Sequence, residues 1–254
     1  PHEPEEETIR RDRYNRMLWT GVLTRADIAR LGDDEWLNDQ VINAYADSLS
    51  MRDDCLFFAE EIDKRSIFFS TWDVQRILDG AKESRIAGAE MAIRVFGNAM
   101  EARAIDNDVR FEATEHIGRI IFPFHCTATH WCSVTVDVTN SIIKFLDSIF
   151  SRRRMSSYTQ LYNVLTTFAE RVWPDKKAAT WTMYYDQKYP TNDLTMESVP
   201  QQAGDVDCGV FTAMFMDFEA IGANIDFTQD DIQFFRQKIA LTLLAIDGDN
   251  ATPM

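Results

Sequence analysis

Apolar and polar residues recur with a helical period in the first part of the chain. Residues 23–31 have the pattern of a short amphipathic helix with Thr24 as its N-cap. The next helix is expected to begin near Asn38 or Asp39. Residues 73–105 also fit a helical pattern. We expect one or two broken helices there, because three glycines interrupt the pattern: Gly80, Gly88 and Gly97.

Runs of β-branched and aromatic residues predict a sheet in the middle of the chain. These residue types are concentrated in three consecutive segments, 118–126, 130–138 and 141–149. A two-residue link, Thr139-Asn140, is expected to join the second and third segments as a hairpin. Further strands are expected around residues 67–69 and 181–185, and further helices over residues 157–173, 207–221 and 230–246. Helices that flank an antiparallel-rich sheet indicate an α+β fold.

The composition narrows the class of protein and of partner. The chain has 254 residues and a net charge of −15, which repels phosphate backbones, so we expect no nucleic-acid partner. No apolar run approaches the length of a membrane span, so we expect no membrane association. The four cysteines form no C-x-x-C pair and suggest a reducing compartment rather than a disulfide framework. An intracellular protein of the nucleus or cytoplasm is the expectation, in a host cell if the chain is a secreted effector.

Cys208 is the candidate nucleophile. It stands in the polar segment PQQAGDVDCGVF, which leads into the apolar helix expected over residues 207–221. A thiol at a helix N-terminus lies near the positive end of the helix dipole, which stabilises the thiolate. Gly209 is expected to leave room for a substrate backbone. A buried structural cysteine is the alternative interpretation of this position.

His130 and Asp147 are the candidate base and orienting carboxylate. His130 begins the second strand segment and Asp147 lies near the end of the third. Because a short hairpin joins these strands, the start of one lies beside the end of the other, and we expect the two side chains to be neighbours. A thiolate nucleophile requires a base, and the base requires an orienting group. Gln202, six residues before Cys208, is the candidate oxyanion donor, with the backbone N–H of Cys208 as a second donor.

Four motifs, in this order, resemble those of the ubiquitin-like-protein-specific (SUMO, Ulp/SENP-type) cysteine proteases of clan CE. The motifs are WLND at 36–39, HW at 130–131, Asp-Ser at 147–148 and QQ-x4-DCG-x-F from Gln201. The resemblance extends from about Leu23 to Glu219. It implies a papain-like α+β fold with a central mixed or antiparallel sheet flanked by helices, and a triad of His130, Asp147 and Cys208.

The resemblance also implies how a substrate would bind. Trp36 and Trp131 match the positions that cover a narrow tunnel for an extended di-glycine tail. Two flat indoles can enclose a glycine backbone and exclude residues with larger side chains. Asp39 matches a position that pairs with an arginine of the ubiquitin-like partner, and it can also act as a helix N-cap. The alternative for both tryptophans is a role in the core.

The chain departs from the family pattern in one region. The stretch between WLND and His130 is longer than the family usually has, and residues 80–115 account for the difference. We therefore expect a flexible lead-in over residues 1–16 and a single catalytic domain over residues 17–254 with a helical insertion at about 80–115. The basic run Arg152-Arg153-Arg154 is expected to be a solvated loop.

The predicted activity is that of a thiol isopeptidase and endopeptidase that cleaves after the C-terminal Gly-Gly of a ubiquitin-like modifier, with SUMO first and ubiquitin, NEDD8 or dual specificity as alternatives. No cofactor and no metal are expected. A zinc site is the first rival interpretation, because four potential ligands fall within eight residues: His125, Cys126, His130 and Cys132. An effector acetyltransferase of the same clan and a non-catalytic binding module are the other rivals.

Overall fold

A computed structural model describes the larger part of the chain. The described ranges are residues 23–104, 114–149, 151–176, 181–185 and 199–248. The predicted lead-in over residues 1–16 lies outside these ranges, and so do residues 105–113 of the predicted insertion. The helices are α1 (Arg25–Ala29), α2 (Asp39–Phe58), α3 (Thr71–Glu83), α4 (Arg85–Ala104), α5 (Met155–Val172), α6 (Cys208–Ile221) and α7 (Ile232–Gly248).

The described strands form one mixed sheet in the order β1-β2-β3-β4-β5. The strands are β1 (Arg65–Phe68), β2 (Ile117–Thr127), β3 (His130–Asp137), β4 (Ile142–Leu146) and β5 (Thr182–Tyr185). The two inner pairs, β2/β3 and β3/β4, are antiparallel, and the two outer pairs are parallel. The expected α+β fold with a mixed, antiparallel-rich sheet is therefore confirmed.

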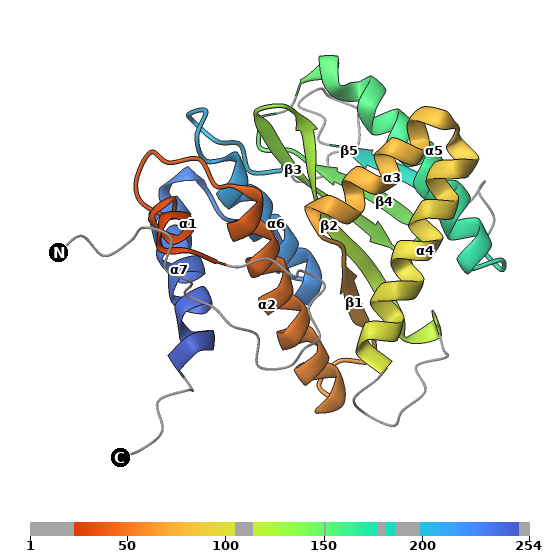
Figure 1. Ribbon diagram of the computed structural model, residues 1–254, viewed down its shortest axis with the longest axis horizontal. Coiled ribbons are helices and arrows are strands. Elements are labelled where there is room, and N and C mark those ends of the chain that lie inside the picture. Colours follow the sequence, from red (N-terminus) through yellow and green to blue (C-terminus); the bar gives the residue numbers. More distant parts are fainter. Residues whose placement is uncertain (1–22, 105–113, 150, 177–180, 186–198, 249–254) are drawn as a thin grey trace.

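Helices cover both faces of the sheet (Figure 1). One core lies between the sheet and α3, α4 and α5, and a second core is shared with α1, α2, α6 and α7. Alternation along β2 serves both cores, because Ile120 and Phe122 belong to the first and Ile121 belongs to the second. Of the predicted insertion, residues 85–104 form α4, which contributes Ala89, Val95 and other buried residues to the first core.

Thr24 is the N-cap that the sequence suggests, whereas α2 is capped by Asn38, so the N-cap role considered for Asp39 is wrong. Thr24 forms a reciprocal capping box with Asp27 at the start of α1. Asn38 accepts a hydrogen bond from the Val41 N–H and begins α2. The Asn38 amide also donates to Asp27 Oδ1 at 2.6 Å, so the two helix starts are joined. This contact fixes the segment between them, which carries Trp36.

Two local predictions need correction. The link between β3 and β4 is longer than the predicted Thr139-Asn140 pair, because the last paired residues are Asp137 and Ile142. The break in the 73–105 helical pattern falls at Ser84, an extended residue between α3 and α4, and not at a glycine. A Cβ on Gly88 would lie 3.0 Å from the Cβ of Ala81, so this glycine allows α3 and α4 to pack closely.

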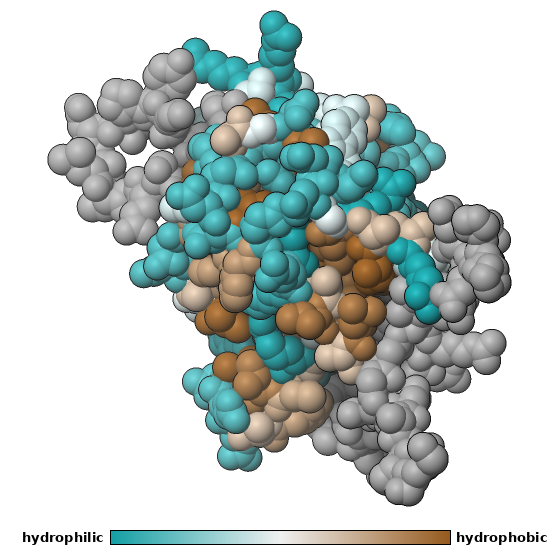
Figure 2. All heavy atoms as spheres, turned by 90° about the vertical axis from the view of Figure 1, so that its left-hand side faces the viewer, coloured by the Kyte–Doolittle hydropathy of each residue, from teal (hydrophilic) through white to brown (hydrophobic). Residues whose placement is uncertain are grey.

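The side of the molecule formed by α1 and α7 is partly apolar. α7 buries one stripe of side chains in the second core and exposes another, which consists of Phe234, Leu241 and Leu244. Figure 2 views the molecule from this side and shows brown patches among the hydrophilic surface. None of the helices within the described ranges is both long enough and apolar enough to cross a bilayer.

Candidate active site

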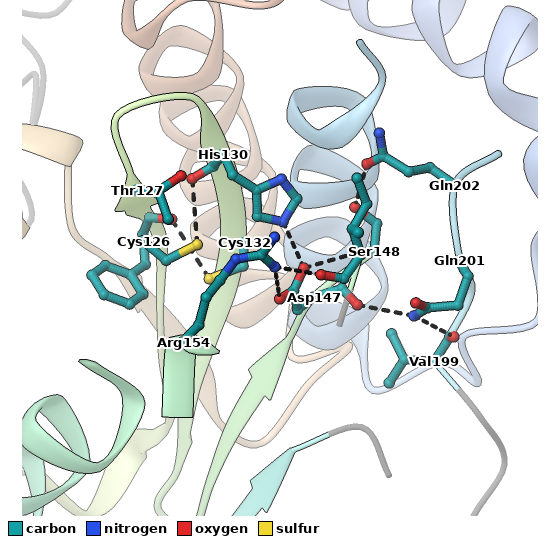
Figure 3. A network of polar contacts seen from close by, with 12 residues as sticks. Cys126, Thr127, His130, Cys132, Asp147, Ser148, Arg154, Val199, Gln201 and Gln202 are labelled. Atoms are coloured by element: carbon teal, nitrogen blue, oxygen red, sulfur yellow. Dashed lines mark hydrogen bonds and ion pairs between the residues drawn. The ribbon is translucent and has the colours of Figure 1, made fainter. Parts of the chain in front are cut away.

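The β3–β4 hairpin places His130 beside Asp147. His130 is the first residue of β3, and Asp147 directly follows the last residue of β4. The Nε2 atom of His130 lies 2.6 Å from Asp147 Oδ1, and Figure 3 shows the network of polar contacts around them. Both residues are buried, with 5% and 1% of their surface exposed. The predicted proximity of the two side chains is confirmed.

Asp147 is held by donors on both of its carboxylate oxygens. Besides His130, the Ile149 N–H donates to Oδ1 at 2.9 Å, and the Tyr158 hydroxyl donates to Oδ2 at 2.6 Å. A guanidinium N–H of Arg154 donates to Oδ2 as well. Burial raises the pKa of Asp147, but the bonds from His130, Tyr158 and Ile149 outweigh it and leave the pKa below its usual value. Asp147 therefore stays ionised at neutral pH.

His130 is poised to carry a proton. Burial of the ring lowers its pKa, but hydrogen bonds to Asp147 and to the Cys208 thiol outweigh burial and raise the pKa of His130 to about 9. Because Nε2 faces Asp147, the other ring nitrogen is the one left for Cys208. The structure thus brings together all three residues that the sequence proposed as a triad, in a geometry suited to a thiolate–imidazolium pair.

Cys208 is the first residue of α6 and is 3% exposed. The preceding residue, Asp207, makes no side-chain cap on the helix. Its carboxylate instead accepts from Arg236 at 2.7 Å and from the Gln229 amide at 2.9 Å. The first N–H groups of α6 thus have no side-chain cap, and they are suited to stabilise negative charge that develops next to the thiol.

Arg236 links the nucleophile to the segment that carries Trp36. This buried side chain donates to backbone carbonyls of that segment and, through the same guanidinium group, to Asp207. The acceptor carbonyls belong to Arg30, Gly32 and Glu35. Arg236 of α7 therefore holds both Asp207, which precedes Cys208, and the backbone that precedes Trp36.

Gly209 has a different role from the predicted one. A Cβ at this position would lie 2.7 Å from the Cβ of Leu37, which is closer than side-chain carbons approach. The space that the sequence analysis reserved for a substrate backbone is therefore filled by Leu37, which is 4% exposed. Gly209 allows the start of α6 to pack directly against the residue that follows Trp36.

Gln202 lies near the triad, but its side-chain donor is engaged elsewhere. Its Oε1 accepts from the Ser148 hydroxyl at 2.6 Å, and its Nε2 donates to the Gly204 carbonyl at 2.7 Å. The neighbouring Gln201 donates to the Asp147 carbonyl at 2.9 Å. Both glutamines thus tie the loop before Cys208 to the end of β4 (Figure 3). The oxyanion role of Gln202 remains a prediction, and it requires the amide to leave Gly204.

A pocket of about 430 Å³ leads to Cys208. Three predicted substrate-binding residues line it: Trp36, Trp131 and Asp39. Trp36 is 43% exposed, which excludes the core role considered for it. Trp131 is stacked on His125, with 4.1 Å between ring centroids. Burial lowers the pKa of His125, and the nearby charge of His130 lowers it further, while Asp39 opposes both effects.

Three further residues belong to this site, and none of them was predicted from the sequence. Trp72, at the start of α3, lines the pocket and donates its indole N–H to Asp39 Oδ2 at 3.2 Å. The predicted solvated loop is wrong for Arg154. Its side chain is only 14% exposed and forms an ion pair with Asp147. Tyr158 lies one helical turn later on α5 and was assigned only to an amphipathic helix. No sequence pattern marks these residues, since their contacts with Asp39 and Asp147 join different elements and follow no helix or strand period.

The arrangement does not favour the rival zinc site. His130 uses one ring nitrogen for Asp147, and His125 lies flat against Trp131. Cys132 is fully buried in the first core. Within the described ranges, no group of three or more His, Cys, Asp or Glu side chains is arranged to hold a metal ion.

Comparison with known proteins agrees with the fold. The profile described as the Ulp1 protease family, C-terminal catalytic domain, matches residues 35–251. Sentrin-specific protease 2 of Homo sapiens is 23% identical over 222 residues, which cover 87% of this chain and 32% of that protein. Ubiquitin-like-specific protease ESD4 of Arabidopsis thaliana is 25% identical over 222 residues, which cover 84% and 38%. The chain spans about a third of the length of these curated relatives.

Solved structures share the fold. The C-terminal Ulp1 protease domain in complex with Smt3, the yeast ortholog of SUMO, aligns with a TM-score of 0.63 and 17% identity over 91% of this chain and 86% of that one. The catalytic domain of the Chaetomium thermophilum Ulp1-like SUMO protease aligns with a TM-score of 0.61 and 21% identity over 88% and 79%. Since the family profile covers most of the sequence and the fold agrees with it, this chain belongs to the Ulp1 protease family.

Proposed function

We propose that this chain is a cysteine protease that cleaves after the C-terminal Gly-Gly of a ubiquitin-like modifier. The observation that carries the proposal is that Cys208, His130 and Asp147 are linked by hydrogen bonds, with Cys208 lining the same pocket as Trp36 and Trp131. The cleaved bond is either an isopeptide bond to a substrate lysine or a peptide bond in a precursor of the modifier. The proposed domain is residues 17–254.

The first half-reaction forms a thioester. The Cys208 thiolate attacks the carbonyl carbon of the terminal glycine, and the carbonyl oxygen becomes an oxyanion beside the N–H groups at the start of α6. Gln202 supplies a further donor once its amide turns from Gly204. The imidazolium of His130 then gives its proton to the leaving amine as the C–N bond breaks. Asp147 keeps the ring oriented throughout.

The second half-reaction releases the modifier. Neutral His130 takes a proton from a water molecule, and the resulting hydroxide attacks the thioester carbonyl. The C–S bond breaks, Cys208 leaves as the thiolate beside the imidazolium of His130, and the modifier departs as a carboxylic acid that loses its proton to the solvent. No metal or redox cofactor takes part in these proposed steps.

The shape of the pocket supports a di-glycine substrate. Trp36 and Trp131 present flat aromatic surfaces that fit an extended chain without side chains. Asp39 stands at the same pocket with its carboxylate held by Trp72, and it is suited to bind an arginine of the modifier. We favour SUMO over ubiquitin and NEDD8, because the matched relatives are named as sentrin-specific or SUMO proteases.

We infer that the protein works in a reducing compartment, the nucleus or the cytoplasm. All four cysteines are free thiols in the structure, and the proposed nucleophile functions only when it is reduced.

Cleavage of a SUMO–lysine isopeptide substrate tests the proposal. The wild-type chain is expected to release free SUMO, whereas Cys208→Ala is expected to bind the conjugate without cleaving it. Cys55→Ala is the matched control, because Cys55 is an exposed cysteine outside the pocket lining. Cleavage by Cys208→Ala would refute the mechanism. Activity on acetyl-donor substrates with none on any conjugate would favour the acetyltransferase instead.

A further inference from the structure

We propose that Arg154 is a positioning residue that fixes Asp147 and offsets part of its charge, so that the His130–Cys208 pair is held in its reactive geometry. This inference deepens the proposed function and rests on it. The run Arg152–Arg154 forms a 3-10 turn directly before α5, and its three arginines differ in their surroundings. Arg152 and Arg153 are exposed, whereas Arg154 turns inward to the carboxylate.

The contacts of Arg154 join three parts of the site. Its guanidinium donates to Asp147 Oδ2 (Figure 3). It also donates to the backbone carbonyl of Ile149. Ile149 in turn donates its own N–H to Asp147 Oδ1 at 2.9 Å. The turn after β4 is therefore closed around the carboxylate by Arg154, and the start of α5 is joined to the end of β4.

Tyr158 completes the set of donors. It lies four residues after Arg154, one turn along α5, and is fully buried. Its hydroxyl donates to Asp147 Oδ2 at 2.6 Å, on the same oxygen as Arg154. An ionised carboxylate has about four lone-pair sites, and here four donors occupy them. Asp147 cannot rotate without breaking a bond, so the ring of His130 is fixed with Nε2 toward it.

The charge of Arg154 has a separate consequence. A guanidinium is always protonated in proteins, so one carboxylate faces two cations, Arg154 and the His130 imidazolium. Arg154 offsets part of the negative field that holds the proton on His130. Without it the imidazolium would be more stable and a weaker acid toward the leaving amine. A general acid works best when its pKa lies near the working pH, so this offset favours turnover.

Other titratable groups face the same cluster and must be controlled. Hydrogen bonding from Cys132 lowers the pKa of Cys126 most strongly, and the charge of His130 lowers it further, against the effect of burial. Burial raises the pKa of both Cys132 and Tyr158, so neither is expected to ionise near neutral pH. Of these three groups, Cys126 is therefore the one whose ionisation can affect His130. Cys126→Ser removes this effect, because a serine hydroxyl does not ionise in the pH range of the assay.

Three substitutions separate geometry from charge. Arg154→Gln removes the positive charge and the guanidinium hydrogen bonds to Asp147 and Ile149. Arg154→Lys keeps the charge but loses the planar guanidinium group. Tyr158→Phe removes one hydrogen-bond donor to Asp147 without changing the charge. Arg153→Gln is the matched control, because it removes the adjacent exposed arginine. Each variant is made with and without Cys126→Ser.

The first readout needs no modifier. The rate of alkylation of Cys208 by iodoacetamide is measured against pH by mass spectrometry of the Cys208 peptide. We expect Arg154→Gln to move the alkaline transition of this profile upward by about half a pH unit or more, as expected for loss of a nearby cation. Arg154→Lys and Arg153→Gln should keep the wild-type transition, and Tyr158→Phe should shift it less than Arg154→Gln does.

The second readout is turnover of the Gly-Gly substrate. Arg154→Gln and Tyr158→Phe should each lower kcat by about tenfold with KM little changed, because misplacement of the ring affects the transition state and not binding. Arg154→Lys should recover part of kcat. An Arg154→Gln variant with the alkylation profile and kcat of Arg153→Gln would overturn the inference. If the wild-type chain cleaves no modifier, the proposed function fails, and the alkylation profiles still decide the role of Arg154.

Discussion

The contact between Gly209 and Leu37 gives the sharpest test of how the nucleophile is seated. Helix propensity alone predicts that Gly209→Ala stabilises α6, by up to about 1 kcal/mol. The structure predicts the opposite sign, because the new Cβ would lie 2.7 Å from the Leu37 Cβ and 3.2 Å from its Cγ. Ordinary carbon contacts begin near 3.5 Å, so the two segments must separate by several tenths of an ångström or more.

The expected magnitude follows from the burial of both partners. Overpacking of a well-filled interior costs about 1–3 kcal/mol, so we expect the free energy of unfolding to fall by that amount. Leu37 directly follows Trp36, so the displacement also reaches the pocket. We therefore expect Gly209→Ala to slow the reaction of Cys208 with a substrate-shaped probe, relative to the unchanged chain. Its reaction with iodoacetamide should change less, because that reagent is small.

Urea denaturation and a double-mutant cycle provide the assay. Gly204→Ala is the matched control, because a Cβ there has nothing within 4 Å and the residue lies in the loop before the same helix. Leu37→Ala alone is expected to cost about 2–5 kcal/mol, as for other buried leucines. In the double variant Leu37→Ala/Gly209→Ala, the contacts with Cγ and Cδ1 are removed but the 2.7 Å contact with Cβ stays, so only part of the cost of the added methyl should be relieved; Leu37→Gly in place of Leu37→Ala removes that contact too, and there the cost should vanish. A Gly209→Ala protein as stable as Gly204→Ala would refute the packing argument.

Three further predictions concern the pH response and the pocket. First, the pKa of His130 is raised from its ordinary 6.5 to about 9, so the stability that its ion pair with Asp147 contributes is complete below pH 6.5 and is lost as pH rises through 9. Urea denaturation measured across this pH range should show the decline in the free energy of unfolding, and the decline should be absent in Asp147→Asn. Second, Trp72→Phe removes the N–H donor to Asp39 but keeps an aromatic ring, so KM for the modifier, measured by steady-state kinetics, should change less than about fivefold. Asp39→Asn should raise KM more strongly, because it removes the charge itself. Third, Ser148→Ala releases Oε1 of Gln202; kcat should fall, and Gln202→Ala should add little further loss in the double variant.

The sequence predicted the features that depend on local periodicity. Runs of β-branched and aromatic residues in 130–138 and 141–149 identified two paired strands, and their pairing brought His130 and Asp147 together without further information. The polar segment before a fully apolar helix placed Cys208 at a helix N-terminus. The capping residues Thr24 and Asn38 also have local partners, at three residues' distance.

The features that the sequence did not predict depend on side-chain contacts that no helix or strand period specifies. Arg154 resembles its two exposed neighbours in sequence and differs from them only because the turn after β4 directs it to Asp147. The role of Gly209 depends on Leu37, which is far away in the chain. The side chain of Gln202 has acceptors and donors on two sides, so its orientation is decided by Ser148 and Gly204. Periodicity carries no information about such pairings.

The central claim is that Cys208 is the nucleophile for a modifier that ends in Gly-Gly, and one measurement tests it most directly. The folded chain is incubated with C-terminal electrophile probes built on SUMO, ubiquitin and NEDD8, and any adduct is mapped by mass spectrometry, with Cys208→Ala as the control. We predict a covalent adduct at Cys208 with the SUMO probe, none with Cys208→Ala, and slower or no reaction with the other two probes. An adduct with ubiquitin or NEDD8 alone would keep the mechanism and contradict the choice of SUMO. Folded protein that reacts with no probe, while iodoacetamide still alkylates Cys208, would contradict the claim itself.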